Sequence, residues 1–326
     1  MIKAKIRKGV VILSAGAKER VIGVIGAVLL VLFTLYALLD TFVIERSYGT
    51  AAVSPTYEVS TATAAVPDEG ADGSEKAISA SSPVVTENSY SDGEISITLS
   101  EYRAYDTAIY VADVTLSSPD QILSAFADNV YGRNVKDETS SIAADNGAIL
   151  AINGDFYGSR NSGYVIRNGV LYRNVPAGNE DLVIWSDGEF GFINERDVSA
   201  EELLSNGAYQ VFSFGPALVS DGCIAVTEGE EVGRAKASNP RTAIAVVDDL
   251  HYLFIVSDGR TDESEGLTLS ELAEFALTLG AQDCYNLDGG GSSTMYFNGK
   301  VVNNPTTSGN GTKERSVSDI VYVANY

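Results

Sequence analysis

The chain has 326 residues, 45% of them hydrophobic, and a formal net charge of −22 at pH 7. This acidic balance disfavours binding to the phosphate backbone of DNA or RNA, and it disfavours a polybasic membrane patch. With one histidine and two cysteines, the chain has few residues for a histidine-based catalytic triad or a zinc site.

The N-terminal segment has the charge pattern of a membrane anchor. Met1–Arg20 carries six basic residues and one acid, and Val21–Leu39 has no charged residue. As a helix, the second stretch would span about 28 Å, close to the hydrocarbon thickness of a bilayer. The pattern predicts a cytoplasmic basic tail over 1–20 and a signal-anchor transmembrane helix over 21–44, with the C-terminal part extracellular. Cleavage near Thr50–Ala52 stays open.

A stretch without hydrophobic periodicity follows the predicted anchor. Residues 45–91 are rich in Ala, Ser, Thr, Val and Pro, which is typical of a flexible extracytoplasmic stalk. The alternative is an extra strand on the edge of the domain. Residues 92–326 are enough to bury one sizeable core and predict a single globular domain. Cys223 and Cys284 lie outside the membrane, where they can pair, but the sequence does not decide this.

Strand patterns outnumber helix patterns in this domain. We expect strands over 95–99, 108–116, 148–152, 211–219, 242–247, 250–257, 284–287 and 318–324, with hairpin turns at Asn168-Gly169 and Asp187-Gly188. We expect helices over 120–126, 140–146 and 268–279. The last has apolar residues at helical spacing, a capping box of Thr268 with Glu271, and Gly280 at its end. The predicted fold class is α+β, with mixed β-sheets and several hairpins packed by a few helices.

Five polar clusters lie at the ends of predicted strands. Each alone fits an ordinary turn or a surface ion pair, but five in one domain predict a shared site. Three adjacent glycines cost folding free energy, so we expect residues 289–291 to admit a ligand and to form an anion-binding nest. The clusters are Asn153-Gly154-Asp155-Phe156-Tyr157, Asn239-Pro240-Arg241-Thr242, Ser257-Asp258-Gly-Arg260, Asn286-Leu-Asp288-Gly289-Gly290-Gly291-Ser292 and Glu314-Arg315-Ser316.

These clusters resemble the motifs of a known family. The run Gly266–Phe275, followed by Asn286–Thr294, is similar to the phosphodiester glycosidase family, and the other clusters match that family's motifs in the expected order. The resemblance covers roughly Ala108 to the C-terminus. It implies an α+β fold and release of a sugar from a sugar-1-phosphodiester, here predicted in cell-envelope or exopolysaccharide glycans. It does not identify the sugar.

The chemistry of a glycosyl–phosphate bond assigns a role to each residue type. Cleavage passes through an oxocarbenium-like state, and the leaving phosphate needs stabilised negative charge more than a strong acid. Carboxylates near the anomeric carbon can activate water or act as the nucleophile, whereas arginine forks bind phosphate oxygens in pairs. The predicted catalytic residues are Asp155, Asp258 and Asp288. The predicted substrate-binding residues are Asn153, Arg241, Arg260, Gly289, Gly290, Gly291, Ser292 and Arg315.

Two further functions stay open at this point. One is a non-catalytic glycan-binding or exopolysaccharide-assembly protein on the same fold. The other is a metal-dependent phosphodiesterase, because acid-rich loops offer oxygen ligands to Ca²⁺ or Mg²⁺. The spacing of an EF-hand loop is absent, so the prediction is no metal and no cofactor, with Ca²⁺ or Mg²⁺ as the minority alternative. The combination of acids and arginines favours catalysis over binding alone.

Overall fold

The chain folds as two compact units, residues 1–46 and 47–326. The computed structural model describes residues 4–7, 10–13, 15–50, 83–227, 229–232, 238–307 and 311–325.

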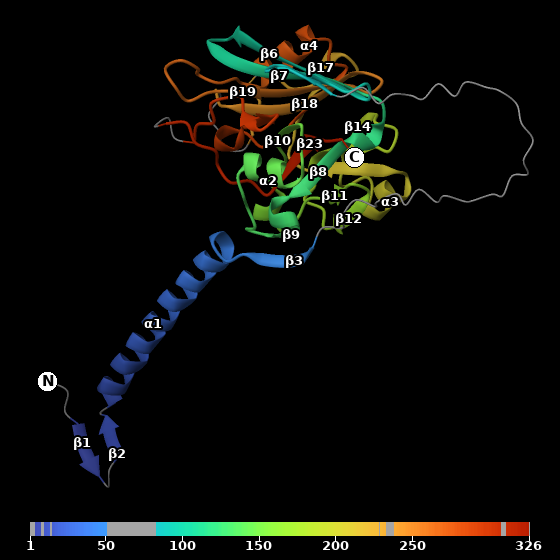
Figure 1. Cartoon of the computed structure of the whole chain (residues 1–326). Helices are drawn as coiled ribbons and strands as arrows, with labels where there is room; N and C mark the ends of the chain where they lie inside the picture. Colours follow the sequence, from blue (N-terminus) through green and yellow to red (C-terminus); the bar gives the residue numbers. More distant parts are fainter. Residues whose placement is uncertain are drawn as a thin grey trace, which may run out of the picture. The chain divides into compact units, whose positions relative to one another are not determined.

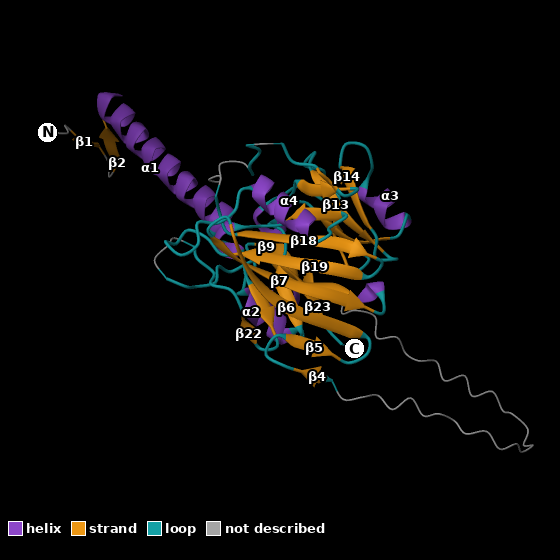
Figure 2. Cartoon of the chain, turned by 90° about the horizontal axis from the view of Figure 1, so that it is seen from above, coloured by secondary structure: helices purple, strands orange, loops and turns teal. Residues whose placement is uncertain are grey.

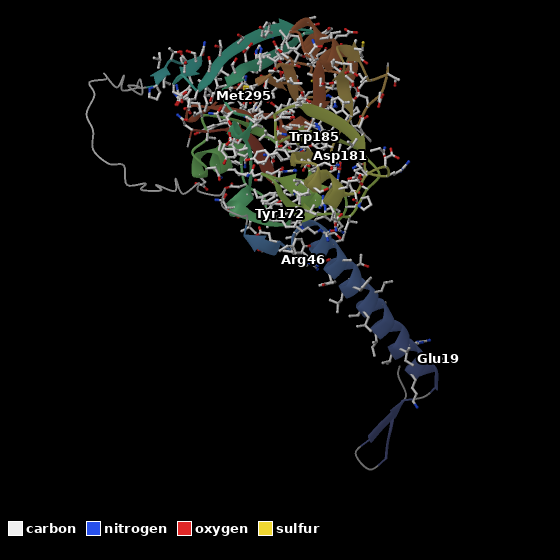
Figure 3. All side chains as sticks on the ribbon, turned by 90° about the vertical axis from the view of Figure 1, so that its right-hand side faces the viewer. Glu19, Arg46, Tyr172, Asp181, Trp185 and Met295 are labelled. Carbon is white, nitrogen blue, oxygen red and sulfur yellow. The ribbon has the colours of Figure 1, made fainter. Side chains whose placement is uncertain are left out.

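The N-terminal unit contains a hairpin and a long helix. Strand β1 (Ala4–Arg7) pairs with β2 (Val10–Leu13), and helix α1 spans Ala15–Phe42. Its apolar side chains are exposed and project around the helix (Figure 3). The part Lys18–Phe42 is long and apolar enough to cross a membrane, and it overlaps the helix predicted over 21–44. The hairpin occupies part of the predicted basic tail.

A nine-stranded antiparallel sheet forms the largest layer of the second unit. Figure 2 shows its strands β18, β19, β7, β6, β5 and β4 lying side by side. The full order is β17 (Cys223–Ile224), β16 (Ala217–Ser220), β20 (Asp283–Asn286), β18 (Arg241–Asp248), β19 (His251–Ser257), β7 (Thr107–Leu116), β6 (Ile95–Ala104), β5 (Ser89–Ser91) and β4 (Val84–Val85).

Two five-stranded sheets and short helices complete the unit. The first sheet has the order β22 (Lys300–Val301), β21 (Met295–Phe297), β10 (Leu150–Asn153), β23 (Asp319–Val323) and β8 (Ile122–Phe126). The second has the order β12 (Val170–Arg173), β11 (Val165–Arg167), β15 (Ala208–Phe212), β13 (Glu180–Trp185) and β14 (Phe190–Asn194). Strand β3 (Arg46–Thr50) pairs with β9 (Val130–Arg133). The helices are α2 (Thr139–Asp145), α3 (Ala200–Ser205) and α4 (Leu269–Thr278), and the 3₁₀ turns are η1 (Pro119–Gln121), η2 (Ala127–Asn129), η3 (Tyr157–Ser159) and η4 (Gly290–Ser292).

The central strands of the large sheet, β20, β18 and β19, are buried on both faces. Side chains alternate across a strand, so Phe254 of β19 joins the core shared with β10 and β13, whereas its neighbour Ile255 joins the core beneath α4. Figure 1 shows α4 on one side of this sheet and β10, β23 and β8 on the other. This double coverage explains why several of the strands read as continuous apolar runs.

Most predicted elements are present, and the α+β fold class is confirmed. Helix α4 has the predicted capping box, in which the Glu271 amide donates to Thr268 Oγ1 over 3.1 Å. Helix α2 corresponds to the helix predicted over 140–146. The structure adds helix α3, which the sequence did not reveal although Ser199 caps it. A six-residue helix presents too few turns for a clear periodic pattern.

The helix predicted over 120–126 is wrong. The first residues form only the 3₁₀ turn η1, and Ile122–Phe126 is strand β8, buried along its whole length. Pairing with β23 determines this state, with Ile122 opposite Val323 and Phe126 opposite Asp319. A short apolar run does not distinguish strand from helix by periodicity, so a partner almost two hundred residues away decides it.

The strand predicted over 211–219 is two strands in different sheets. Strand β15 ends at Phe212, and β16 begins at Ala217 in the nine-stranded sheet. Pro216 lies between them, follows a cis peptide bond and lacks the N–H that a continuous ladder requires. The apolar run therefore crosses from one layer to the next.

The boundaries of the predicted stalk also change. Residues 46–50 form β3, while β4 and β5 add two strands to the edge of the large sheet. The alternative of an edge strand thus describes 84–91, and the domain begins before Asp92. Residues 51–82 of the predicted stalk lie outside the described residues.

Candidate active site

Strand register brings the polar clusters together. Arg241 at the start of β18 is opposite Ser257 at the end of β19, and Asn286 at the end of β20 is opposite Ala243. The ends of β20 and β10 then meet across two sheets, because the Asp288 amide donates to Gly154 O over 3.3 Å. Clusters that are far apart in sequence therefore share one edge of the domain.

Two adjacent cavities lie at this edge. The arginine cavity, about 290 Å³, is lined by Arg160, Arg241, Arg260 and Arg315 among others. The serine cavity, about 350 Å³, is lined by Ser292, Ser316 and Ser318, with Lys136 and Asp155. Both cavities share three lining residues, Phe156, Asp288 and Arg315.

Asp288 lies at the junction of the two cavities, with 13% of its side chain exposed. Its Oδ2 accepts from Ser292 Oγ at 2.7 Å and from Arg315 Nη2 at 3.0 Å. Burial raises the pKa of Asp288, while Arg315, Ser292 and the Gly289 amide oppose that rise by favouring the charged form. The carboxylate is thus partly desolvated, oriented, and reachable from both cavities.

Arg315 bridges the same junction. Its Nε donates to Ser292 Oγ at 2.9 Å and its Nη2 to Gly289 O at 3.1 Å, while 40% of the side chain stays exposed. The guanidinium is therefore fixed along one edge and open to a ligand along the other. A planar fork held in this way suits an anion that enters beside the carboxylate.

Two residues of the triple-glycine loop, Gly289 and Gly290, line the arginine cavity, and the loop also packs closely against the protein. A Cβ on Gly290 would meet Arg260 Nη2 at 2.7 Å, and one on Gly291 would meet Thr307 Oγ1 at 2.5 Å. The Gly290 amide already donates to Pro240 O. The glycines thus make room for the protein's own groups, and Gly291 lines neither cavity.

Asn153 lines neither cavity, and its side chain contacts the Asp288 loop from the interior. Its side chain is fully buried, and Nδ2 donates to the Asp288 carbonyl at 2.6 Å. Oδ1 accepts from Thr242 Oγ1 and from the Thr294 amide. Both ends of the amide are therefore used to hold the Asp288 loop against β18.

Asp258 is not brought to the cavities. Its Oδ1 accepts from the Asn304 amide at 2.8 Å and from Asn303 Nδ2, and its Oδ2 accepts from Asn304 Nδ2 at 3.0 Å. The carboxylate lines neither the arginine nor the serine cavity. It anchors a loop, so its predicted catalytic role is not supported by this geometry.

Asp155 lines the serine cavity, but both of its carboxylate oxygens bind buried groups of the protein. Its side chain is 1% exposed, Oδ2 pairs with Arg167 at 2.9 Å, and Oδ1 accepts from the Tyr157 amide. Arg167 also binds Asp319 at 2.8 Å. Burial and repulsion from Asp155 raise the pKa of Asp319 to about 8, against the opposing effect of Arg167. Arg167 and Asp319 belong to none of the five polar clusters, and their network with Asp155 supports the cavity wall.

The other two predicted arginines are held firmly. Arg241 is buried, pairs with Glu231 at 2.5 Å and donates to Leu267 O at 2.8 Å. Arg260 has a left-handed backbone, with φ of 63°, and donates twice to Asn239 Oδ1. Burial lowers the pKa of both arginines.

Several cavity residues escaped the sequence analysis. The Phe156 ring is 37% exposed, with Lys136 Nζ and the Arg160 guanidinium each 5.7 Å from its centroid. The Arg160 guanidinium also lies 5.4 Å from the centroid of Phe214. Phe156 belongs to the first polar cluster, so its position beside Asp155 was a usable signal. Nothing in the sequence around Phe214 or Lys136 indicated that these residues line a cavity.

Cysteines and metal ligands add no further site. Cys223 is exposed and Cys284 is buried, and both are free thiols. Among the described residues, no group of three or more His, Cys, Asp or Glu side chains is arranged to hold a metal ion.

Known proteins share this sequence pattern and this fold. The chain is 32% identical to the uncharacterized prophage-derived protein YomE of Bacillus subtilis, over 53% of this chain and 28% of that protein. It is 31% identical to human N-acetylglucosamine-1-phosphodiester α-N-acetylglucosaminidase, over 52% of this chain and 35% of the enzyme. The chain therefore spans about a third of the length of these curated relatives.

Solved structures support the fold. The catalytic domain of the zebrafish N-acetylglucosamine-1-phosphodiester α-N-acetylglucosaminidase aligns with a TM-score of 0.56 at 21% identity, over 72% of this chain and 83% of that one. A hypothetical protein from Synechocystis aligns with a TM-score of 0.54 at 16% identity, over 71% of this chain and 62% of that one. A model of the phosphodiester glycosidase family matches residues 146–324, more than half of the chain. The chain belongs to the phosphodiester glycosidase family.

Proposed function

We propose that this protein is a hydrolase that releases sugars from sugar-1-phosphodiesters in cell-envelope or exopolysaccharide glycans. The observation that carries the proposal is the Asp288–Arg315 pair at the junction of the two cavities. The bond to be cleaved joins the anomeric carbon of the sugar to a phosphate oxygen. A carboxylate suits the carbon end of this bond, and an arginine beside it suits the phosphate end. The human relative is named for the same class of reaction.

The contrast between the cavities suggests how a substrate lies. Hydroxyl and carboxylate groups in the serine cavity suit the hydrogen-bonding pattern of a sugar ring, while the arginine cavity suits the phosphate. The anomeric carbon then lies beside Asp288. The leaving phosphate lies against Arg315, which compensates the charge that develops on the bridging oxygen.

The reaction then needs one carboxylate and no strong acid. Asp288 accepts a proton from water as the water oxygen bonds to the anomeric carbon, and the carbon–oxygen bond to phosphate breaks. The bonding pair leaves with the phosphate, giving a free sugar and a phosphomonoester. Direct attack by Asp288 would instead retain the anomeric configuration, so the configuration of the product distinguishes the two routes.

We further propose that this reaction takes place outside the cytoplasm. Helix α1 would cross the cell membrane once, with the basic N-terminus in the cytoplasm and the C-terminal domain outside. Protease added to intact cells should then digest the domain. Protection of the domain in intact cells, with digestion after lysis, would contradict this orientation.

The direct test is sugar release by the full-length protein in detergent. A panel of methyl phosphodiesters of common sugars should yield free sugar, and the rate should be unchanged by EDTA because the proposed chemistry uses Asp288 and arginines only. Loss of activity in EDTA, with recovery on adding Ca²⁺ or Mg²⁺, would favour the metal-dependent alternative. Tight glycan binding without turnover would indicate the non-catalytic alternative.

Arg315→Gln should shift the pH dependence as well as lower the rate. Arg315 favours the charged form of Asp288, so its loss raises the pKa of Asp288 further above the ordinary range. Because the ionised form is needed, the acid limb of kcat/KM should move to higher pH. The rate on the plateau should fall by about 10²–10³-fold.

The control for this variant is Arg103→Gln, which changes an exposed arginine that donates to Glu263 O. It should leave both the plateau and the acid limb unchanged. An unchanged acid limb in Arg315→Gln would show that Asp288 does not govern the pH profile.

A further inference from the structure

Two neighbouring acids, Asp181 and Glu195, are buried outside both cavities. Asp181 lies on β13, the strand that also carries Trp185 (Figure 3). Its side chain is fully buried, and among the described residues no N–H or O–H group donates to either of its carboxyl oxygens. Glu195 directly follows β14 and is 3% exposed. Two adjacent carboxyl groups in a protein interior cannot both be charged without a large cost in free energy.

Glu195 has the surroundings of a carboxylate. Its Oε2 accepts from three successive backbone amides, those of residues 177–179, and its Oε1 accepts from the Tyr164 amide at 2.8 Å. Gly178 has a left-handed φ of 81°, which a residue without Cβ adopts at little cost and which helps neighbouring amides point at one oxygen. Several backbone donors stabilise a negative charge, so Glu195 is the charged member of the pair.

Asp181 is the neutral member of the pair. Burial, and then the charge of Glu195, raises the pKa of Asp181 to about 9, and the nearby Ser213 hydroxyl opposes this rise only in part. The side chains of Asp181 and Glu195 are close enough for a hydrogen bond, and two carboxyl groups form one only when one of them carries a proton. At neutral pH, Asp181 therefore keeps its proton and donates to Glu195.

The other titratable groups that face Asp181 do not compete for this proton. Asp155 also raises the pKa of Asp181, but Asp155 is itself paired with Arg167. The charge of Asp181 also acts on Tyr164 and Tyr285, and burial is the main cause that raises the pKa of each of these tyrosines above 10. Of the groups in direct contact with this pair, Asp181 is thus the one that loses a proton first as the pH rises above neutral.

Ser213 links the buried pair to both cavities. Its Oγ donates to Glu195 Oε1 at 3.3 Å and accepts from Asn179 Nδ2 at 3.0 Å. Its amide donates to Asp155 Oδ2 at 3.1 Å, and its carbonyl accepts from Arg160 Nη1 at 3.0 Å. Asp155 lines the serine cavity, and Arg160 lines the arginine cavity. The position of Ser213 therefore affects one wall of each cavity.

Taking the proposed hydrolysis as given, we propose that Asp181 is a positioning residue for it, because the proton that Asp181 shares with Glu195 holds Ser213 and thereby Arg160 in place. When Asp181 loses this proton, two buried carboxylates repel each other. Glu195 then shifts together with the amides of residues 177–179, and Ser213 no longer holds Arg160. Asp288 keeps its own partners, Ser292 and Arg315, so binding weakens more than the chemical step.

The experiment compares Asp181→Asn with the wild type from about pH 6 to about pH 10, using the full-length protein in detergent and the methyl phosphodiesters. The wild type should show an alkaline limb with an apparent pKa near 9, along which KM rises by about tenfold or more while kcat changes little. An asparagine amide can donate to Glu195 at every pH, so Asp181→Asn should lack this limb. The control Asp187→Asn, an exposed carboxylate on the same hairpin, should keep it.

The shared proton has a second readout that does not depend on activity. Asp181 has a folded pKa of about 9 and an ordinary value near 4, so between these pH values the folded state binds a proton that the unfolded state lacks. The stability that this proton provides is lost as the pH rises through that window. The urea midpoint of the wild type, followed by the fluorescence of Trp185, should therefore fall relative to that of Asp181→Asn between about pH 5 and about pH 9.

An alkaline limb that persists in Asp181→Asn would overturn the positioning role and assign the limb to another group, such as Lys136, whose pKa is lowered by burial and by Arg315. A limb that appears in kcat alone would also overturn it, as would a wild type without an alkaline limb. Urea midpoints that run parallel in the two proteins would show that Asp181 holds no extra proton. Failure to release sugar at any pH, with midpoints that diverge as expected, would instead overturn the proposed function.

Discussion

Asp288→Asn is expected to lower kcat/KM by about 10⁴-fold, as the loss of a central catalytic carboxylate does in other hydrolases. The amide keeps an oxygen that can accept from Ser292 and Arg315, but it can neither take a proton from water nor stabilise a developing positive charge. Of the three carboxylates predicted to be catalytic, Asp288 alone lines both cavities. Sugar release in a sensitive discontinuous assay measures the effect.

Folding and activity are separable in this variant. Burial raises the pKa of Asp288, which means that the native environment disfavours its charge, so a neutral amide should leave the unfolding midpoint close to that of the wild type. Asp113→Asn, an exposed carboxylate on β7, is the matched control and should keep full activity. More than a tenth of wild-type activity in Asp288→Asn would rule out the proposed role.

Arg167→Met should destabilise the domain by about 3–5 kcal/mol at pH 8, the usual effect of removing one partner from a buried ion pair. Arg167 is enclosed between Asp155 and Asp319, and it also donates to Val211 O. Methionine fills similar space but leaves two buried carboxyl groups without a cation. Urea unfolding, followed by the fluorescence of Trp185, the chain's one tryptophan, measures the loss.

The loss should shrink as the pH falls. Without Arg167, nothing opposes burial and the repulsion from Asp155, which raise the pKa of Asp319 in the folded state above its unfolded value, so the folded state binds more protons. Stability of the variant is then greatest below the unfolded pKa, near 4, and declines as the pH rises. Arg103→Met, at an exposed position, should change stability little at any pH. A deficit in Arg167→Met that does not vary with pH would contradict a buried charge as its cause.

Local patterns in the sequence predicted much of the fold. Three features depend only on neighbouring residues, so they could be identified without tertiary information. They are the uncharged run after Met1–Arg20, the capping box of α4 and the hairpin turns. The segment Ile122–Phe126 could not, since its state depends on β23. Phe212 and Ala217 looked like parts of one strand because nothing local says which sheet each side of Pro216 will join.

The sequence by itself also determined which segments carry the candidate functional side chains. These segments are turns at strand ends, and the preference of Asn, Asp and Gly for turns can be recognised from neighbouring residues alone. Only the tertiary structure decided which of those side chains share a cavity. Asp258 and Asp288 occupy similar positions in their motifs, yet one is used to anchor Asn304 while the other faces both cavities. The physical reason is that strand pattern and turn chemistry act over a few residues, whereas the meeting of Asn153 with the Asp288 loop depends on pairing between sheets across 135 residues of chain.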